Sequence, residues 1–516
     1  MKKEVLPMYI TGRYGLAVYL GEYFNAITNP SARAYGGFGD GTKTAEEMLL
    51  DSGRNVHGEL WGCASTCDIL INCEHDGFNQ IKLFDAFFNY WKYKPEKHII
   101  NISSRAAQPN ISKGYLYASQ KAALNHYTNN VVYNSDKALI IYKVRGGYNL
   151  YTDFSKKIIL TNNKINSFFN LIKNKKYKEE TDLYIGFFGY EILCNLLNIK
   201  IKNQKKLNFY KGIFYKPETI IKIRKDIKII SSVKKHKFNN YFNKTQILNP
   251  FRTNINYKKY KKIFELFAKK IRQGQTYQIK ICTKYKNRST INPINFFWKL
   301  MKINSSPESF MIRDKNFSIV SCSPETLIDK KGNTIITKPI AGTLKKSKKI
   351  NKKKALNFFK NNEKETKEHN MIVDMERSDL SRICRPGTVK ILRKKYVEEY
   401  KHLFHYVTSI QGKLKKTTTP KNIIKSMMPG GSVIGCPKIR TLELLNNQET
   451  EDRNIFTGSF GYIKFNQDMK FNIIIRSILN FRNISEISAA SGVVLDSSSK
   501  KEFNENFIKA KSLLEL

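Results

Sequence analysis

The sequence predicts two domains, a small α/β domain with a parallel sheet and a larger α+β domain. Over residues 1–155, short apolar segments alternate with helix-like runs, a pattern typical of parallel strands covered by helices on both faces. Residues 156–180 are rich in Lys and Asn and are expected to form a linker with a short helix. Over residues 181–516, strands and long helices no longer alternate simply, which favours α+β.

The first domain is expected to contain short apolar strands with helices between them. The strands are predicted at 8–10, 68–72, 97–104 and 138–144. The helix-like runs are 16–24, 83–91 and 117–129. Strands that are separated in this way by helices predict a parallel sheet.

The second domain shows strand-like segments and long amphipathic helices in an irregular order. Strands are expected at 279–285, 318–322, 335–337, 411–414 and 458–465. Helices are expected at 258–272, 352–374 and 500–514. The total length of 516 residues provides enough apolar material for a large core in such a domain.

The net charge of +47 allows a nucleic-acid-binding or scaffold protein as an alternative to an enzyme. The Lys excess, however, is spread along the whole chain and accompanies many Ile and Asn residues, as it would in a genome of biased composition. We therefore expect no nucleic-acid partner, although a positive field would help to capture an anionic substrate.

The spacing of the cysteines and the length of the apolar runs indicate the cellular compartment of the protein. The eight cysteines show no repeated CxxC spacing, which favours reduced thiols over a zinc site. The first residues include a Lys pair but no long apolar core, and no run reaches the roughly 18 apolar residues of a membrane helix. The sequence therefore predicts a cytoplasmic protein with no membrane segment.

Five separated motifs in the second domain pair acidic clusters with Gly-rich turns and basic residues. They are SPE at 323–325, PIAGT at 339–343, ETKEH at 365–369, the PGGS to CPKIR run at 429–440, and the DS to EFNE run at 496–505. Each of two Glu-x-x-Glu pairs places both carboxylates on one helix face. Oxygen ligands suit Mg²⁺, which keeps some waters and leaves room for a substrate carboxylate. The set indicates a divalent metal that bridges a small dianionic substrate.

In order and wording, these motifs resemble those of the chorismate-binding enzymes, which include the large components of anthranilate synthase and aminodeoxychorismate synthase and also isochorismate synthase. The resemblance covers about residues 180–516. It implies an antiparallel-sheet-rich α/β sandwich, chorismate as the substrate and Mg²⁺ as the cofactor. The metal ligands and their surroundings would be Glu365, Glu368, Glu502 and Glu505.

The same resemblance implies roles for further residues. Catalytic roles are expected for Glu325 as acid or base, for His405, which would polarise the ring, and for Thr343 and Ala341. Substrate binding is expected for Arg476, Tyr462, Lys438, Gly342 and Lys509. Ordinary surface charge or core packing is the alternative for several of these residues, above all for Lys438.

The product is left open between two members of the family. Tyr277-Gln278, the PGGS run and Phe471-Asn472 resemble aminodeoxychorismate synthases and favour 4-amino-4-deoxychorismate. Ala341 stands where those enzymes often have a nucleophilic Lys, and Ala341 fits direct attack by ammonia, the anthranilate route. No nucleophilic-Cys elbow of a glutamine amidotransferase is present, so we expect ammonia from a separate glutaminase subunit or from free ammonium. Lys280 departs from the family at an Asn-like position.

The N-terminal domain carries a second set of candidate residues. Tyr117 and Lys121 share a helix face, so that an ammonium can lower the pKa of the phenol. Together with Ser104, with Asn72 at a strand end and with glycines in the first turn (Gly12 and Gly15), they resemble the short-chain dehydrogenase/reductase family. This resemblance implies a Rossmann-like domain that binds NADP(H). The Gly turn is shorter than in that family, so a degenerate scaffold is the alternative.

Overall fold

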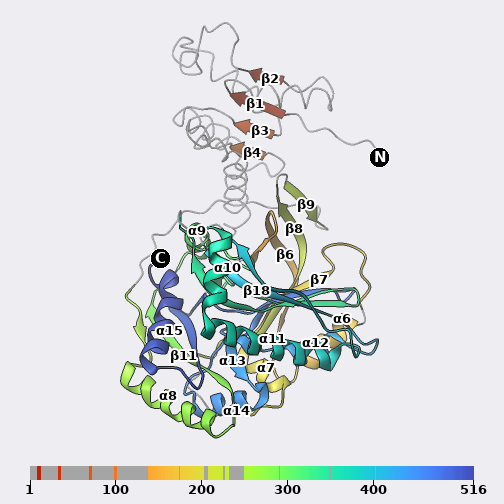
Figure 1. The fold of residues 1–516 in the computed structure, drawn as a ribbon. Helices are drawn as coiled ribbons and strands as arrows, with labels where there is room; N and C mark the ends of the chain where they lie inside the picture. Colours follow the sequence, from red (N-terminus) through yellow and green to blue (C-terminus); the bar gives the residue numbers. More distant parts are fainter. Residues whose placement is uncertain are drawn as a thin grey trace. The chain divides into compact units, whose positions relative to one another are not determined.

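The computed structural model describes residues 138–516 except 174, 203–206, 225–226, 232–248, 290, 348–349 and 401–402, together with four strands nearer the N-terminus (Figure 1). The chain divides into two compact units. One comprises Met1–Ser135 with the short segments Ile223–Ile227 and Lys234–Phe242, and the other comprises the remainder. No helix among the described residues is both long enough and apolar enough to span a bilayer.

The described part of the smaller unit is a parallel sheet. Its strands are β1 (Met8–Gly12), β2 (Arg33–Gly36), β3 (Ile69–Asn72) and β4 (His98–Asn101), in the order β2-β1-β3-β4. Gly12 ends β1 and Asn72 ends β3. Gly15, Ser104, Tyr117 and Lys121 lie outside the described residues. The Rossmann-like fold and the NADP(H) site therefore stay predictions.

The larger unit is built on one extended sheet of 19 strands among its described residues. Its first half contains β5 (Leu139–Val144), β6 (Gly147–Ile159), α6 (Ile165–Lys173), β7 (Leu183–Phe188), α7 (Tyr190–Leu196), β8 (Gly212–Ile223), β9 (Ile227–Ser231), β10 (Arg252–Thr253), α8 (Tyr257–Arg272), β11 (Gln278–Arg288), α9 (Pro293–Ile303), β12 (Phe310–Arg313), β13 (Phe317–Ser321), β14 (Thr326–Lys331), β15 (Thr334–Lys338) and β16 (Ile340–Lys345). Its second half contains α10 (Lys352–Asn361), α11 (Glu363–Ile383), β17 (Lys390–Glu399), β18 (Leu403–Lys413), α12 (Pro420–Met427), α13 (Gly431–Ile434), β19 (Gly435–Cys436), α14 (Lys438–Gln448), β20 (Ser459–Lys464), β21 (Met469–Asn472), β22 (Ser477–Phe481), β23 (Ile484–Val493) and α15 (Ser499–Leu514).

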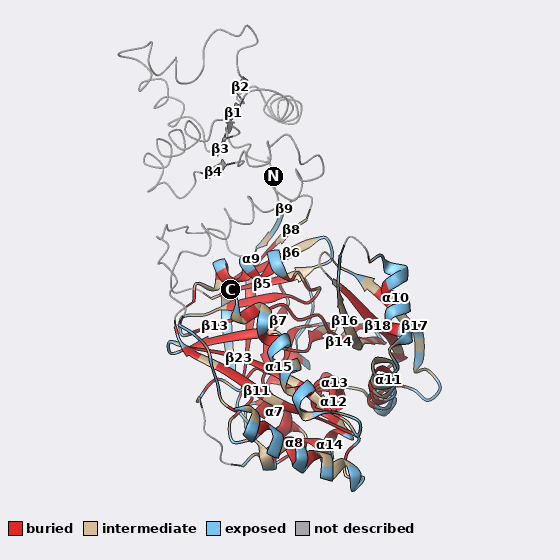
Figure 2. Cartoon of the chain, turned by 60° about the vertical axis from the view of Figure 1, so that its left-hand side comes forward, coloured by how far each residue is buried: buried red, intermediate tan, exposed pale blue. Residues whose placement is uncertain are grey.

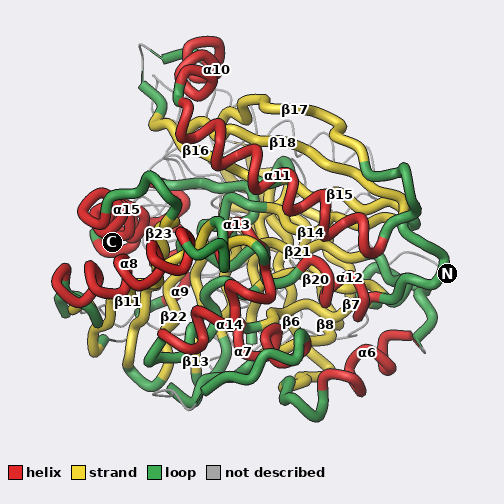
Figure 3. Tube along the Cα trace, turned by 60° about the horizontal axis from the view of Figure 1, so that its bottom comes forward, coloured by secondary structure: helices red, strands yellow, loops and turns green. Residues whose placement is uncertain are grey.

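The sheet is buried on both faces, as a sandwich requires. Along β7, Tyr184 and Phe188 belong to one apolar core, whereas Ile185 and Phe187 belong to another. Successive side chains of a strand point to opposite faces, so β7 separates the two cores. Figure 2 shows central strands such as β7 and β13 buried and the outward sides of the helices exposed. Figure 3 shows α7 and α11 to α14 across one face of the strands.

The structure corrects the predicted domain boundary. β5 was expected in the N-terminal domain, but it pairs antiparallel with β6 and β12 of the larger sheet. Residue 155 falls within β6, and the predicted linker 156–180 contains the end of β6 and all of α6. The first four residues of β5 are buried and apolar, and such a run does not reveal from the sequence which sheet the strand will join.

The structure also divides one predicted helix. Residues 352–374 were expected as a single helix, but α10 ends and α11 begins at Asn362. The Asn362 side chain accepts a hydrogen bond from the backbone N–H of Glu365, which caps α11 at its N-terminus. This break places Glu365 and Glu368 in the first two turns of α11.

Candidate active site

Strand β11 lies at the centre of the candidate site. It pairs with β23 on one side and with β19 at its start, so that Lys280 lies opposite Gly492 and Gln278 opposite Cys436. Gln278 and Lys280 are two residues apart on a strand and therefore share a face. Both side chains are buried and both donate to the same atom, Oε1 of Glu368, at 2.8 Å and 2.7 Å.

Gly492 provides the space for these two side chains. A Cβ atom at this position would lie 2.6 Å from Lys280 Nζ and 2.9 Å from Gln278 Nε2. Such distances are far shorter than van der Waals contact, so any larger residue would force the ammonium to move. Gly492 is therefore needed to leave room for the Lys280 and Gln278 side chains.

Helix α15 adds two carboxylates to this region. Glu502 is buried and accepts a hydrogen bond from Ser497 Oγ at 3.2 Å. Glu505 pairs with Lys509 at 2.6 Å, and Lys509 Nζ also donates to the carbonyl of Ala490 at 2.9 Å. Both glutamates of the second predicted Glu-x-x-Glu pair thus have hydrogen-bond or ion-pair partners, and Lys509 links Glu505 to the end of β23.

Lys280 Nζ lies 2.7 Å from Glu368 Oε1, and the charges of Glu505 and Glu502 also act on it; we call these four residues the acidic group. Burial would lower the pKa of Lys280, but the charges of Glu368, Glu505 and Glu502 outweigh burial and raise it. In return, the Lys280 ammonium lowers the pKa of Glu368 to about 2 despite burial. Burial would raise the pKa of Glu505, but Lys509 and Lys280 lower it. At neutral pH, Lys280, Glu368 and Glu505 are therefore charged.

Glu365 lies one turn earlier on α11 and approaches a different motif. A Cβ atom on Gly342 would lie 3.1 Å from Glu365 Oε2 and 2.7 Å from Phe359 Cε1. Gly342 also has a φ of +78°, a conformation that side chains rarely adopt. The PIAGT glycine is therefore required both by its backbone and by the close approach of Glu365.

These observations revise the predicted magnesium site. Four glutamates were expected to converge on one ion, whereas the structure pairs Glu368 with the Lys280 ammonium, on which the charges of Glu505 and Glu502 also act. Among the described residues, no three His, Cys, Asp or Glu side chains are placed to hold a metal ion. The carboxylates offer the oxygen donors that Mg²⁺ prefers, but Lys280 and Lys509 each occupy an oxygen of one of them. As arranged, the residues do not fit a magnesium site.

A second cluster adjoins the acidic group and contains Glu325, His405, Arg476 and Ser432; we call it the acid-base group. Glu325 is buried and accepts a hydrogen bond from Ser432 Oγ at 2.9 Å. Burial raises the pKa of Glu325 to about 7, although Ser432, Lys280 and Arg476 act in the opposite direction. The Lys280 ammonium of the acidic group thus also acts on Glu325.

His405 and Arg476 complete the acid-base group. His405 is fully buried on β18, where its backbone pairs with that of Thr343. Burial and the positive charge of Arg476 lower the pKa of His405 to about 3, so the ring is neutral at physiological pH. Burial also lowers the pKa of Arg476, with Cys322 and Glu325 opposing this effect. Arg476 follows β21 with a φ of +51°.

The PGGS run positions Ser432 beside Glu325. A Cβ atom on Gly431 would lie 2.0 Å from Met375 Sδ on α11, and one on Gly430 would lie 2.5 Å from Ile473 Cδ1. The two glycines therefore let the short helix α13 pack directly against α11 and the end of β21. This close packing brings the Ser432 hydroxyl to the buried carboxylate.

Other predicted residues lie elsewhere or have other partners. Lys438 is buried in an ion pair with Asp379 at 2.6 Å and donates to the Ser426 carbonyl at 2.7 Å, which indicates the structural role that was the alternative for it. Burial raises the pKa of Tyr462, and the nearby Tyr151 and Asp329 raise it further. Neither Tyr151 nor Asp329 belongs to the acidic group or the acid-base group. The backbones of Ala341 and Thr343 lie in β16, while their side chains are outside the described residues.

Sequence reasoning missed three contributors. Gln278 and Ser432 stood inside recognised motifs, but no role was predicted for either side chain. Glu376 is buried on α11, and burial and Asp379 raise its pKa to about 8, with Glu325 adding to the effect. Glu376 lies eight residues after Glu368, a spacing that places both on one face of a helix. Helical periodicity was therefore the signal that could have found it.

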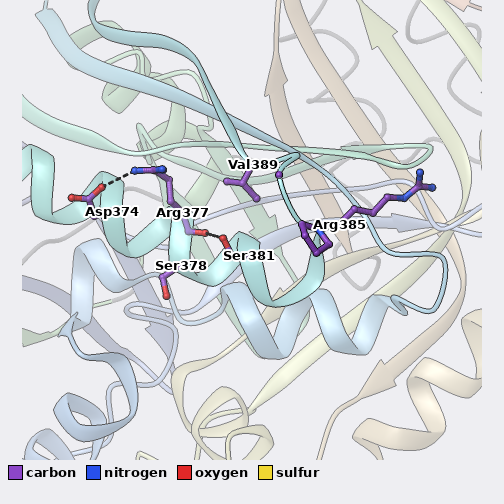
Figure 4. A pocket seen from close by; sticks show the side chains of 8 residues that line it. Asp374, Arg377, Ser378, Ser381, Arg385 and Val389 are labelled. Carbon is purple, nitrogen blue, oxygen red and sulfur yellow. Dashed lines mark hydrogen bonds and ion pairs between the residues drawn. The ribbon is translucent and has the colours of Figure 1, made fainter.

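A separate cavity of about 350 Å³ lies along α11 and the loop that follows it. In Figure 4, Arg377 points toward Asp374, with which it forms an ion pair at 3.2 Å, whereas Arg385 points away from both. None of the predicted site residues lines this cavity. It is not a candidate for the active site.

Comparison with known proteins identifies related sequences. A family described as chorismate binding enzyme matches residues 128–515. Aminodeoxychorismate synthase component 1 of Bacillus subtilis is 36% identical over 252 residues, which are 48% of this chain and 54% of that protein. An anthranilate synthase component I-like protein of Synechocystis sp. is 30% identical over 347 residues, which are 64% of this chain and 72% of that protein. The chain thus spans about half the length of the first of these relatives.

Solved structures show the same fold. Anthranilate synthase component I from Streptococcus pneumoniae matches with a TM-score of 0.59 at 24% identity, covering 73% of this chain and 90% of that one. The menaquinone-specific isochorismate synthase from Escherichia coli also gives a TM-score of 0.59, at 15% identity and with 75% and 90% coverage. These matches confirm the predicted antiparallel-sheet-rich α/β fold of the larger unit.

Proposed function

This chain belongs to the chorismate-binding enzymes, and we propose that it aminates chorismate to 4-amino-4-deoxychorismate for para-aminobenzoate and folate synthesis. The observation that carries the proposal is the acid-base group, in which the charge of the half-buried Arg476 acts on both the buried Glu325 and the buried His405. Ammonia would come from a separate glutamine amidotransferase subunit. We propose that the enzyme acts in the cytoplasm.

The protonation states of the acid-base group suit the removal of a ring hydroxyl. With a pKa of about 7, Glu325 is protonated in a large fraction of molecules at neutral pH and can give its proton to a leaving hydroxyl. The Arg476 guanidinium presents a planar fork that matches a substrate carboxylate. The neutral His405 ring can polarise the adjacent side of the substrate without adding a third charge.

Amination at the other ring position, which gives anthranilate, is the second candidate. Ala341 favours it, because alanine cannot supply the amine nucleophile that would form a covalent ring adduct. Against it stand the Tyr277-Gln278, PGGS and Phe471-Asn472 motifs and the similarity to the Bacillus subtilis protein. Magnesium is the cofactor that the family resemblance implies, and it could bind the carboxylates of the acidic group only where their ion pairs with Lys280 and Lys509 are broken.

Product analysis tests this proposal. The full chain is incubated with chorismate, Mg²⁺ and ammonium, and a pyruvate-eliminating lyase then separates para-aminobenzoate from directly released anthranilate. Glu325→Gln should lower kcat by roughly 10² to 10⁴, because the substituted amide cannot transfer the proton. The matched control is Glu443→Gln, which removes an exposed carboxylate paired with Arg440 on α14 and should leave turnover unchanged. Turnover that survives in Glu325→Gln would refute the assigned role.

For the N-terminal unit we propose a separate reductase-like function with NADP(H). Support comes from the sequence resemblance around Ser104, Tyr117 and Lys121. Titration with NADPH, followed by cofactor fluorescence, should show saturable binding that Lys121→Ala weakens. Absence of binding at millimolar cofactor would indicate a degenerate scaffold. Duplex DNA binding with a steep salt dependence but no chorismate turnover would favour the basic scaffold alternative.

A further inference from the structure

We propose that Lys280 is an internal cation that occupies the acidic group and competes with Mg²⁺ for its carboxylates. The inference rests on the proposed function in one respect, namely that the acidic group is where magnesium would act. It concerns metal affinity, however, and can be tested without any substrate.

The first argument is the saturation of one carboxylate oxygen. Glu368 Oε1 accepts hydrogen bonds from Lys280 Nζ at 2.7 Å and from Gln278 Nε2 at 2.8 Å. Lys280 is only 5% exposed, so little water competes for its ammonium. A metal ion that bound this oxygen would have to displace at least the ammonium.

The second argument is that the surrounding residues are shaped to keep the ammonium in place. Gly492 faces Lys280 across the β11–β23 pair, and a Cβ there would lie 2.6 Å from Nζ. The lysine stem is therefore accommodated by the absence of a side chain on the neighbouring strand. Lysine on its flexible four-carbon stem can also leave the group without movement of the backbone, which makes competition reversible.

The third argument is the charge of the acidic group. Two of its carboxylates are already paired with ammonium groups, since Lys280 Nζ lies 2.7 Å from Glu368 Oε1 and Lys509 Nζ lies 2.6 Å from Glu505 Oε1. A divalent cation added to this set would meet a nearly neutralised site. When the Lys280 ammonium is removed or displaced, the Glu368 carboxylate loses this partner, and its attraction for Mg²⁺ rises accordingly.

The experiment is a calorimetric titration of MgCl₂ into the full chain and three variants. Lys280→Gln should bind Mg²⁺ roughly tenfold to a hundredfold more tightly than the wild type, because one charge-assisted hydrogen bond no longer has to be broken. Lys280→Arg keeps the cation and should show no gain. The matched control, Lys286→Gln, removes another β11 lysine that pairs with Glu486 at 3.3 Å, and should bind Mg²⁺ like the wild type.

A second measurement uses the wild type alone and does not depend on whether a variant folds. Acetylation of lysines by a soluble acyl ester, with quantification of the Lys280 peptide by mass spectrometry, reports how accessible the ammonium is. Saturating Mg²⁺ should raise the labelling of Lys280 and leave that of Lys286 constant. Magnesium binding without any rise in Lys280 labelling, or equal affinity of the wild type and Lys280→Gln, overturns the inference.

Failure of this inference differs from failure of the proposed function. If chorismate is not consumed but Lys280→Gln gains Mg²⁺ affinity, the function is wrong and the competition stands. If chorismate is aminated while all variants bind Mg²⁺ equally, the function stands and Lys280 has no part in metal binding.

Discussion

At the scale of single residues, burial gives the ionisable groups of the site their chemical character. The Glu325 carboxyl and the His405 ring both favour their neutral forms, since a charged group loses its hydration when buried. Lys280 is also buried and Glu368 is half-buried, yet both stay charged because each lies 2.7 Å from the other. Pairing therefore decides which buried groups carry charge.

The raised pKa of Glu325 predicts a pH-dependent stability. Its folded-state pKa of about 7 exceeds the ordinary value of 4.5, so the folded protein holds this proton more tightly than the unfolded chain. The stabilisation is complete below pH 4.5 and is lost as the pH rises through 7. The wild type should lose up to roughly 3 kcal/mol of unfolding free energy from this group by pH 8.

Urea denaturation of the wild type and of Glu325→Gln at pH 5 and pH 8 measures this effect. The variant, which cannot ionise at this position, should show a smaller loss of unfolding free energy over that interval. Glu443→Gln serves as the control and should follow the wild type. Equal pH dependence in all three proteins would contradict the assigned environment of Glu325.

At the scale of elements, short local features decide which side chains reach the site. Asn362 ends α10 and caps α11, and this places Glu365 in the first turn of α11. Gly430 and Gly431 let α13 approach α11, and Ser432 then reaches Glu325. Gly342 combines a positive φ with a tight contact to Phe359 and Glu365.

A pair of glycine substitutions separates the cost of a positive φ from the cost of a steric clash. Gly342→Ala should destabilise the protein by about 2–4 kcal/mol, since it combines backbone strain with a clash against Phe359. Gly332 has a φ of +54° in the β14–β15 turn but no neighbour within 4 Å, so Gly332→Ala should cost only about 1–2 kcal/mol. Chemical denaturation measures both, and a larger loss in Gly332→Ala would contradict the packing argument.

At the scale of the whole molecule, the larger unit takes its first strand from a segment that the sequence places with the N-terminal domain. β5 forms backbone pairs with both β6 and β12, and Leu139 to Tyr142 are buried. The compact units accordingly divide near residue 135. The larger unit therefore includes more of the chain than the prediction of 181–516 allowed.

Truncation tests this boundary. A chain that starts at residue 136 keeps β5 and should unfold cooperatively with native-like circular dichroism. A chain that starts at residue 156 lacks β5 and most of β6, exposes the edge of β12, and should aggregate or lose cooperativity. Equal stability of the two chains would show that β5 adds nothing to the larger unit.

The sequence by itself determined the chemistry-bearing motifs, the antiparallel α/β fold of the larger unit and the family. These features could be predicted because they depend on the spacing of glycines, carboxylates and apolar residues along the chain. The Glu368 and Glu505 motifs and the apolar periodicity of α15 are examples. Tertiary structure alone decided that β5 joins the larger sheet and that Lys438 pairs with Asp379. It also decided that an ammonium lies among Glu368, Glu502 and Glu505. These outcomes depend on contacts between residues far apart in the chain, which no local pattern records.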